Sequence, residues 1–453
     1  MAGARLSGFP EWLPEGRIVE QSILDTARRI FELHGFASIE TRAVEPLPEL
    51  TRKGEIDKEV YVIRRLHAEG DGDAGLGLHF DLTVPFARYV VENAGKLEFP
   101  FRRYQIQKVW RGERPQEGRF REFTQADIDV VDKDSLAFHY EVDMAVVMSA
   151  LLAALPIPRS VIHVSNRKVA EGFYRALGVT DTAAVLRVVD KIDKVPEPAL
   201  CTMLAEQAGM SESAINMCLK LASIRSHDTS FVDDVRALGV SDPLLDEGLD
   251  ELARVVSGVA SLRPGAILAD LRIARGLDYY TGTVYETELE GFAGLGSISS
   301  GGRYDALASD GKVTYPGVGI SLGVTRLVSV LLGKGLLAAT RAVPSAVLVA
   351  VLDEESRSLS GQVAEQLRSR GIACEVASKP DKLGKQIRFA ERRGIPFVWF
   401  PDTGSVKDIR TGDQYEADAA AWDPPAEDLH PRVVRMSDLP SKASPSSTQE
   451  DTP

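Results

Sequence analysis

The sequence has few cysteines and few histidines, and neither residue type is arranged as a metal or disulfide site would require. Cys201, Cys218 and Cys374 lie far apart and form no C-x-x-C pair. This spacing argues against a disulfide framework and a structural zinc site, and for a reducing compartment. None of the seven histidines belongs to an H-E-x-x-H segment, which argues against a zinc metalloprotease.

Long hydrophobic runs are also missing. The longest apolar stretch, 145–158, is shorter than a membrane span and contains Pro156 and Pro158, so we expect a buried helix. The first residues, MAGARLSGFPEW, include no apolar segment of the kind that secretory signals carry. We therefore expect a cytoplasmic protein without a membrane partner.

A net positive charge is also absent, because 66 acidic residues outnumber 53 basic ones and give a formal net charge of −13. Such a balance speaks against a protein that coats nucleic acid, but it allows an enzyme that binds RNA through local basic patches. The 453 residues are too many for one ordinary domain, and the hydrophobic fraction of 44% is that of a globular protein with a substantial core.

The order of helix and strand patterns predicts a mixed α+β sheet domain, a helical insertion and a small C-terminal α/β domain. The segment 346–352, AVLVAVL, reads as a strand buried on both faces, and strand and helix patterns alternate after it. The predicted division is 1–173 and 262–338 for the two parts of the sheet domain, 174–261 for the insertion, 339–345 for a linker, 346–435 for the C-terminal domain and 436–453 for a disordered tail.

The segment 101–131 is the densest functional signal, and it reads as two strands joined by a polar loop. The loop carries Arg114, Gln116 and Arg119, side chains suited to contact phosphates or an RNA end. In the second strand, alternation places Gln125 and Asp129 on one face with Phe123 and Asp127. That face could hold a cationic amino group beside a flat ring. A solvated, charge-balanced hairpin explains the same pattern equally well.

Three further segments carry unusual combinations of glycine, tyrosine and arginine. ARGLDYYTGTVYE (274–286) could hold a carboxylate at Arg275, or be a bulged turn with core tyrosines. SISSGGRYDAL (297–307) reads as a glycine-rich turn into a helix. YPGVGISLGVTRLVSVLL (315–332) reads as a strand followed by a helix from Leu322, with Arg326 inside the helix. SISSGGRYDAL is not a G-x-G-x-x-G motif, and no P-loop motif (G-x-x-x-x-G-K-[ST]) occurs in the chain.

Together these segments resemble the class II aminoacyl-tRNA synthetases, and within them the histidyl-tRNA synthetase family. WRGE in the hairpin resembles the second class II motif, GVGISLGVTRLV the third, and RGLDYYTGTVYE the segment that marks the histidyl family. DLTVPFARY (81–89) is similar to a substrate-pocket segment of that family, and KLGKQIRFAERRGIP (382–396) to its anticodon-binding domain. The resemblance implies an antiparallel-sheet catalytic domain with a helical insertion, plus a C-terminal α/β anticodon-binding domain.

The resemblance also implies a reaction and a role for each matching residue. ATP and L-histidine form histidyl-adenylate, and histidine is then transferred to tRNA(His), with Mg²⁺ bridging the phosphates and a homodimer as the expected assembly. Arg275 and Arg111 are the implied catalytic residues. ATP is expected at Arg111, Glu113, Phe123 and Arg326, and histidine at Asp81, Leu82, Thr83, Gln125, Asp129, Arg275, Tyr279, Tyr280 and Tyr304.

The C-terminal basic residues point to tRNA. Lys385 and Arg388 fall in one expected helix with Lys382 and Arg392, and positions 385, 388 and 392 share a face. A solvated amphipathic helix is the alternative. For the whole chain, the alternative is the catalytically silent paralogue that serves as regulatory subunit of ATP phosphoribosyltransferase. In that family the anticodon domain is absent and the RGLDYYTG segment is degraded, whereas both are intact here.

Overall fold

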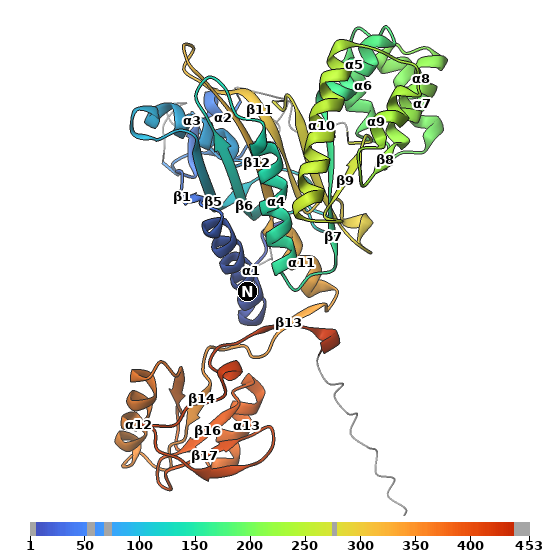
Figure 1. The fold of residues 1–453 in the computed structure, drawn as a ribbon. Coiled ribbons are helices and arrows are strands. Elements are labelled where there is room, and N and C mark those ends of the chain that lie inside the picture. Colours follow the sequence, from blue (N-terminus) through green and yellow to red (C-terminus); the bar gives the residue numbers. More distant parts are fainter. Residues whose placement is uncertain (1–5, 52–58, 68–74, 274–278, 439–453) are drawn as a thin grey trace, which may run out of the picture. The chain divides into compact units, whose positions relative to one another are not determined.

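The computed structural model describes residues 6–51, 59–67, 75–273 and 279–438. The described chain divides into two compact units (Figure 1). The first comprises Ile23–Ser329 with the N-terminal residues up to Pro10, and the second comprises Glu11–Ser22 with the chain from Val330 onward.

A nine-stranded sheet forms the centre of the first unit, in the order β1-β5-β6-β12-β11-β10-β7-β9-β8. Its strands pair antiparallel except for β1 with β5 and β7 with β9. The strands are β1 Ala37–Ser38, β5 Phe101–Trp110, β6 Glu122–Val131, β7 Ser160–Asn166, β8 Arg225–Ser226, β9 Ile267–Asp270, β10 Thr283–Leu289, β11 Ser299–Ser309 and β12 Thr314–Gly323. The predicted α+β class with an antiparallel catalytic sheet is confirmed.

The predicted hairpin at 101–131 is confirmed by the long antiparallel pair β5–β6. Its register runs without a shift from Phe101 opposite Val131 to Trp110 opposite Glu122. β6 pairs with β12 on its other edge, so Asp129 lies opposite Gly319 and Gln125 opposite Gly323. Every residue of β6 from Thr124 onward is buried, which excludes the solvated-hairpin interpretation.

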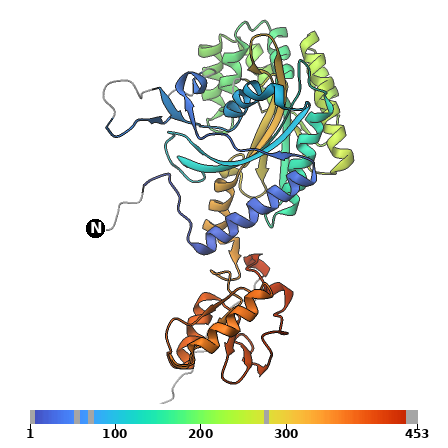
Figure 2. The same cartoon turned by 90° about the vertical axis from the view of Figure 1, so that its left-hand side faces the viewer.

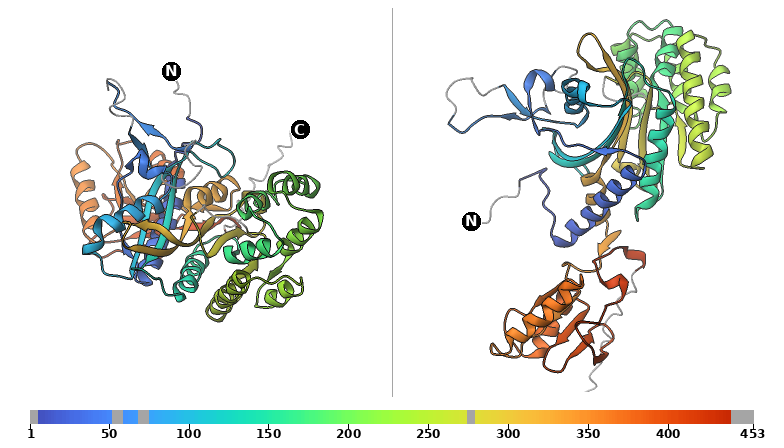
Figure 3. Two further views of the ribbon diagram at one scale, coloured as in Figure 1. Left: turned by 90° about the horizontal axis from the view of Figure 1, so that it is seen from above. Right: turned by 60° about the vertical axis from the view of Figure 1, so that its left-hand side comes forward.

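Helices α4 and α10 lie side by side along one face of this sheet (Figures 1 and 2). The short helices α5 to α9 gather beside β8 and β9, at one edge of the unit (Figure 3). The helices are α1 Pro14–Leu33, α2 Leu47–Leu50, α3 Thr83–Asn93, α4 His139–Ala154, α5 Arg167–Ala176, α6 Thr182–Val189, α7 Glu197–Ala208, α8 Glu212–Ser223, α9 Phe231–Arg236, α10 Pro243–Leu262 and α11 Val324–Gly333. A small sheet, in the order β2-β4-β3, contains β2 Val44–Pro46, β3 Val62–Ile63 and β4 Leu76–Leu78.

Two predictions about secondary structure in this unit were wrong. The segment 297–307 contains no helix, because β11 pairs with β10 on one edge and with β12 on the other. This strand pairing outweighs the local helix preference of residues 305–307. These residues lie at the irregularity where the register shifts between Tyr304 and Ala308. The helix predicted from Leu322 begins at Val324, because Leu322 still pairs with β6 and β11.

Residues 145–154 of the apolar segment form the C-terminal part of α4, and most of them are buried, as predicted. The helix ends at Ala154, before Pro156 and Pro158, and its C-terminal part is apolar on most sides because other elements cover it. Among the described residues, no helix has the length and apolar character that crossing a membrane requires.

The second unit contains a five-stranded sheet in the order β15-β14-β16-β17-β18. The predicted strand at 346–352 forms as β14, and its three residues are fully buried between two apolar clusters. The elements are β13 Leu337–Ala339, β14 Val347–Val349, α12 Arg357–Ser369, β15 Cys374–Val376, α13 Leu383–Arg393, β16 Phe397–Phe400, β17 Ser405–Asp408, β18 Gln414–Glu416 and β19 Val433–Arg435. The predicted β-α-β-α-β order is confirmed. Lys382 directly precedes α13 rather than lying within it.

Candidate active site

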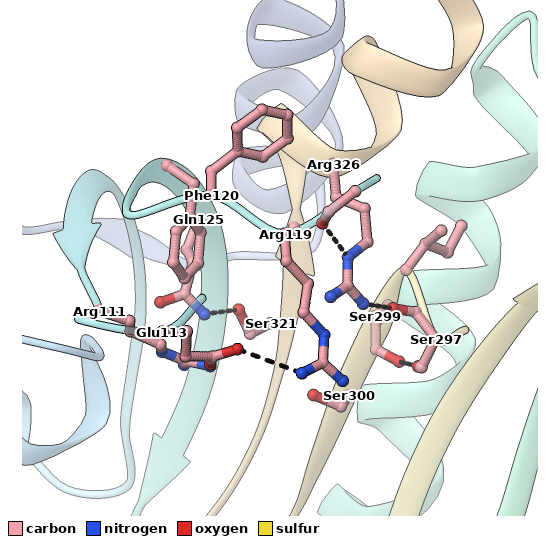
Figure 4. Close-up of a pocket in the computed structure, with 14 residues that line it drawn as sticks. Arg111, Glu113, Arg119, Phe120, Gln125, Ser297, Ser299, Ser300, Ser321 and Arg326 are labelled. Atoms are coloured by element: carbon pink, nitrogen blue, oxygen red, sulfur yellow. Dashed lines mark hydrogen bonds and ion pairs between the residues drawn. The ribbon is translucent and has the colours of Figure 1, made fainter. Parts of the chain in front are cut away.

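A polar pocket of about 110 Å³ opens on the first unit, between the hairpin loop, β6, the starts of β11 and α11, and the end of β12 (Figure 4). All four residues predicted to bind ATP, Arg111, Glu113, Phe123 and Arg326, line it. The remaining lining residues are Gly118, Arg119, Phe120, Gln125, Ser297, Ile298, Ser299, Ser300, Ser321 and Gly323.

The two predicted ATP-binding arginines are held by backbone carbonyl groups. Arg111 Nε donates to the Phe80 oxygen at 2.9 Å, and its guanidinium lies 5.2 Å from the centroid of the Phe123 ring. Arg326 Nε donates to the Gly118 oxygen at 2.7 Å, and its Nη1 donates to the Ser297 oxygen. Because these bonds fix both side chains before any ligand arrives, the pocket is preorganised for an anionic group.

The three hairpin-loop residues predicted to contact tRNA differ in where their side chains lie. Gln116 and Arg119 are joined by two backbone hydrogen bonds, and Gln116 and Arg114 are exposed. Arg119 instead points into the pocket, where its Nη1 lies 3.3 Å from Glu113 Oε2 (Figure 4). Arg119 is therefore placed to contact the same ligand as Arg111 and Arg326.

A buried carboxylate cluster lies next to this pocket on β6. Asp129 is 3% exposed; its Oδ1 accepts from the Tyr304 hydroxyl at 2.7 Å and its Oδ2 lies 2.7 Å from Arg103 Nη2. Asp127 and Asp81 are equally buried, and each has one carboxylate oxygen without a hydrogen-bond partner. Buried oxygens without partners are costly unless a ligand satisfies them. The cluster therefore suits a cationic, hydrogen-bond-donating group.

Arg103, which the sequence analysis did not select, is the cation of this cluster. Its side chain is completely buried, and its positive charge acts on Asp81, Asp127 and Asp129. A signal for it existed in the hairpin. If the two strands pair symmetrically about the loop, residue 103 lies directly opposite Asp129, and this is the observed register.

Burial controls the protonation of these carboxyl groups. It raises the pKa of Asp81 to about 6 and that of Asp127 to about 7, and it also raises the pKa of Asp129. Arg103 opposes the shift at all three residues. Three buried acids with one arginine leave the cluster short of positive charge, and an added cation would favour their ionised forms.

The N-terminus of α3 supplies the other predicted histidine contacts. Asp81 Oδ1 accepts from the Val84 nitrogen at 3.1 Å, and its other oxygen is buried without a hydrogen-bond partner. Leu82 is completely buried and belongs to the core, so its apolar side chain offers no polar contact to a ligand. Thr83, the first residue of α3, hydrogen-bonds to the hydroxyl of Tyr279.

The three predicted tyrosines are brought together around this cluster. The ring centroids of Tyr279 and Tyr280 are 4.8 Å apart, and those of Tyr279 and Tyr304 are 6.1 Å apart. The Tyr280 ring lies on Gly302, where a Cβ would come within 2.8 Å of the ring and of a backbone oxygen. Only glycine at 302 permits this approach. Arg275 lies outside the described residues.

Eight lining residues of the pocket were not among the predicted site residues: Gly118, Phe120, Ser297, Ile298, Ser299, Ser300, Ser321 and Gly323. The serines of the SISS segment were visible in the sequence, but a helix was expected after them. Strand pairing places Ser300 opposite Ser321, and Gln125 Nε2 donates to Ser321 Oγ at 2.7 Å. Gln125 and Ser321 thus line the pocket. Gln125 also lies on the same face of β6 as Asp127 and Asp129, and Ser321 lies opposite Asp127 on the paired strand β12.

The two predicted basic residues of the second unit, Lys385 and Arg388, are exposed on α13. Lys385 Nζ lies 2.9 Å from Asp381 Oδ1, which reduces the positive charge of this face. Among the described residues, no group of histidine, cysteine, aspartate and glutamate side chains is arranged as a protein cage for a metal ion.

The antiparallel sheet, the arginine-bearing hairpin and the strand that leads into α11 define the catalytic domain of a class II aminoacyl-tRNA synthetase. A family model described as histidyl-tRNA synthetase matches residues 8–327, and one described as an anticodon binding domain matches residues 346–415. The chain belongs to the histidyl-tRNA synthetase family. The family, the fold class and the histidine–tRNA ligase activity predicted from the sequence are confirmed.

Near-full-length relatives agree with this assignment. The histidine–tRNA ligase of Cutibacterium acnes is 60% identical over 445 residues, which cover 95% of this chain and 98% of that protein. The histidine–tRNA ligase of Micrococcus luteus is 59% identical and covers 96% of this chain and 99% of its own. The crystal structure of histidyl-tRNA synthetase from Nostoc sp. PCC 7120 is 34% identical, with a TM-score of 0.82, and covers 92% of this chain and 97% of its own.

Proposed function

We propose that the pocket and the carboxylate cluster are the ATP and histidine subsites of one active site. The observation that carries this proposal is their continuity through Gln125, which lines the pocket and stands on the same strand face as Asp127 and Asp129. An ATP α-phosphate beside Arg111 would then face the carboxylate of a histidine whose α-ammonium and ring contact Asp81, Asp129 and the tyrosines.

The first step in this proposal is an in-line displacement. The histidine carboxylate oxygen attacks the α-phosphorus, a new oxygen–phosphorus bond forms, and the bond to diphosphate breaks. Negative charge spreads over the phosphate oxygens, where Arg111 and Arg275 would stabilise it and Arg326 would hold the outer phosphates. In the second step a terminal ribose hydroxyl of tRNA(His) attacks the adenylate carbonyl, and AMP leaves.

Mg²⁺ fits this arrangement as a companion of ATP. The described residues form no preformed cage for a metal ion, and magnesium in such enzymes is held largely by substrate phosphates with one or two carboxylates. When bound, it would neutralise phosphate charge. The arginines named above would still orient the α-phosphate.

For tRNA, we propose contacts at two places in the chain. Arg114 and Gln116 are exposed on the hairpin loop beside the pocket, within reach of a 3′ end, and Lys385 and Arg388 are exposed on α13 in the anticodon-binding domain. We further propose that the enzyme works in the cytoplasm as a homodimer, with the insertion 174–261 and the catalytic parts 1–173 and 262–338 divided as the sequence predicts.

The decisive experiment is histidine-dependent exchange of pyrophosphate into ATP, followed by the same assay on Arg275→Ala. We expect exchange that requires histidine, and a loss of roughly 10²–10³ in rate for the variant with little change in ATP binding, because the missing donor acts on charge that develops in the transition state. Pyrophosphate exchange that does not depend on histidine would contradict the proposal that histidine is the substrate. A variant as fast as the wild type would remove Arg275 from the mechanism.

A further inference from the structure

A second charge cluster, built around a buried carboxylate, lies on the opposite face of the sheet from the carboxylate cluster of β6. Its centre is Glu141, in the first turn of α4, whose side chain is completely buried. Arg303 Nη1 donates to Glu141 Oε1 at 2.8 Å, Thr283 donates to its other oxygen, and the Tyr285 hydroxyl donates to its backbone oxygen at 2.5 Å. The cluster therefore ties α4 to β10 and β11.

This cluster also holds the short segment between the tyrosine pair and β10. Arg303 Nε donates to Asp305 Oδ1 at 3.0 Å, and the hydroxyl of Thr281 donates to the second Asp305 oxygen. The Thr281 nitrogen donates to the Arg303 oxygen at 2.9 Å. A Cβ on Gly282 would lie 3.1 Å from Arg303 Cδ, so the chain runs directly over the Arg303 side chain. Arg303 and its partners thus fix the two residues that follow Tyr280.

The neighbours of Arg303 on β11 are themselves parts of the histidine subsite. Gly302 carries the Tyr280 ring, and Tyr304 donates its hydroxyl hydrogen to Asp129. Strand alternation directs Arg303 to the face of α4, and Gly302 and Tyr304 to the face of the site. A displacement of Arg303 would therefore move Tyr280, Gly302 and Tyr304 of the histidine subsite together.

A gain in stability does not by itself explain why Glu141 and Arg303 form an ion pair at this position. The other buried residues of α4 are mostly apolar, and replacing a buried ion pair with apolar groups is often neutral or stabilising. The helix dipole favours a carboxylate in a first turn. However, both carboxylate oxygens of Glu141 accept hydrogen bonds from the sheet residues Arg303 and Thr283. The carboxylate therefore holds residues of the sheet in position.

We propose that Glu141 and Arg303 are positioning residues for histidine recognition: from the far side of the sheet, their ion pair holds Tyr280, Gly302 and Tyr304 in the arrangement that binds the amino acid. This inference rests on the proposed function, and it concerns residues that touch neither substrate.

The test compares Michaelis constants in the exchange assay for the wild type, Glu141→Gln and Arg303→Met. We expect the constant for histidine to rise roughly tenfold to a hundredfold, the range that follows from misplacing a binding group, while the constant for ATP changes less than about twofold. Loss of folded enzyme lowers the apparent rate but leaves both constants unchanged, so a purely structural role cannot produce this split. Arg303→Lys, which retains the charge, should recover part of the histidine affinity.

The double variant and a control variant sharpen the result. If the two residues act as one unit, the double variant should bind histidine about as weakly as the weaker single variant. Asp428→Asn serves as the control, because Asp428 is a buried carboxylate held by Arg410 at 2.9 and 2.8 Å in the second unit. It should lower stability without changing the Michaelis constant for histidine.

Three outcomes would overturn the inference alone. The first is an unchanged Michaelis constant for histidine in both single variants, and the second is an equal rise for histidine and ATP. The third is a multiplicative effect in the double variant, which would show that the residues act independently. A wild type that exchanges without histidine would overturn the proposed function and the inference together, whereas the other outcomes leave the proposed function standing.

Discussion

Tyr304 donates its hydroxyl hydrogen to Asp129 Oδ1 at 2.7 Å, and this bond joins β11 to β6 across the intervening strand β12. The second oxygen of Asp129 is paired with the fully buried Arg103 at 2.7 Å. Both oxygens of the carboxylate are therefore oriented before a substrate arrives. A carboxylate held in this way can discriminate a donor by position as well as by charge.

Asp129→Ala should raise the Michaelis constant for histidine roughly tenfold to a hundredfold, because hydrogen bonds to charged groups contribute about 1.5–3 kcal/mol. The constant for ATP should stay within about twofold, since Asp129 does not line the pocket that we propose for ATP. Steady-state pyrophosphate exchange measures both constants. Equal increases for the two substrates would indicate a general defect and would contradict this role.

Arg103→Met should destabilise the protein strongly. The substitution leaves buried acids without their cation, and removing one partner of a buried ion pair typically costs about 3–5 kcal/mol. The pKa values of Asp81, Asp127 and Asp129 should rise further, since Arg103 lowers each of them. Urea unfolding of the variant beside wild type checks this expectation. A destabilisation below about 1 kcal/mol would mean that the three acids are already neutral in the folded protein.

The pKa values of Asp81 and Asp127 predict a pH dependence of stability. Both carboxyls have folded-state pKa values raised from 3.8, to about 6 and about 7, so the folded state binds protons that the unfolded state releases. Their contribution to the free energy of unfolding is therefore fully present below about pH 4 and is lost as the pH rises to about 7. Unfolding of the ligand-free protein across this range measures the slope. Asp127→Asn should flatten it, and an unchanged slope would contradict the raised pKa.

Gly319→Ala should abolish most histidine binding. A Cβ at 319 would lie 2.2 Å from Asp129 Oδ1 and 2.7 Å from the Ile128 backbone oxygen, so the carboxylate must move. Gly361→Ala is the matched control, because a Cβ there meets nothing within 4 Å and the residue lies inside α12. The control should stabilise the protein by about 0.5–1 kcal/mol. Isothermal titration with histidine compares the two, and equal affinities would refute the close approach.

The double variant Lys385→Ala/Arg388→Ala should weaken tRNA binding and reduce its log–log salt slope by roughly one unit for each phosphate that the RNA-binding face no longer neutralises. The effect of Lys385 should be the smaller of the two, because Asp381 already neutralises part of its charge. Arg368→Ala, an exposed residue of α12 paired with Glu365, provides the control. If affinity and slope match the wild type, this face of α13 does not contact RNA.

The sequence by itself determined the local features and the family of this protein. Strand alternation predicted the β5–β6 hairpin and the shared face of Gln125 and Asp129, the apolar run at 346–352 predicted β14, and the motif segments indicated the histidyl-tRNA synthetase family. These predictions succeeded because periodicity and side-chain chemistry are encoded over short stretches of chain.

Only the tertiary structure decided which distant residues share one environment. The segment 299–309 became a strand because β10 and β12 offer hydrogen-bond partners on both edges, a long-range gain that local preference does not contain. Burial made Arg103 the cation of the carboxylate cluster, and it paired Glu141 of α4 with Arg303 of β11, 162 residues further along the chain. Burial raises the energetic consequence of every charge, and the degree of burial is a property of the assembled fold.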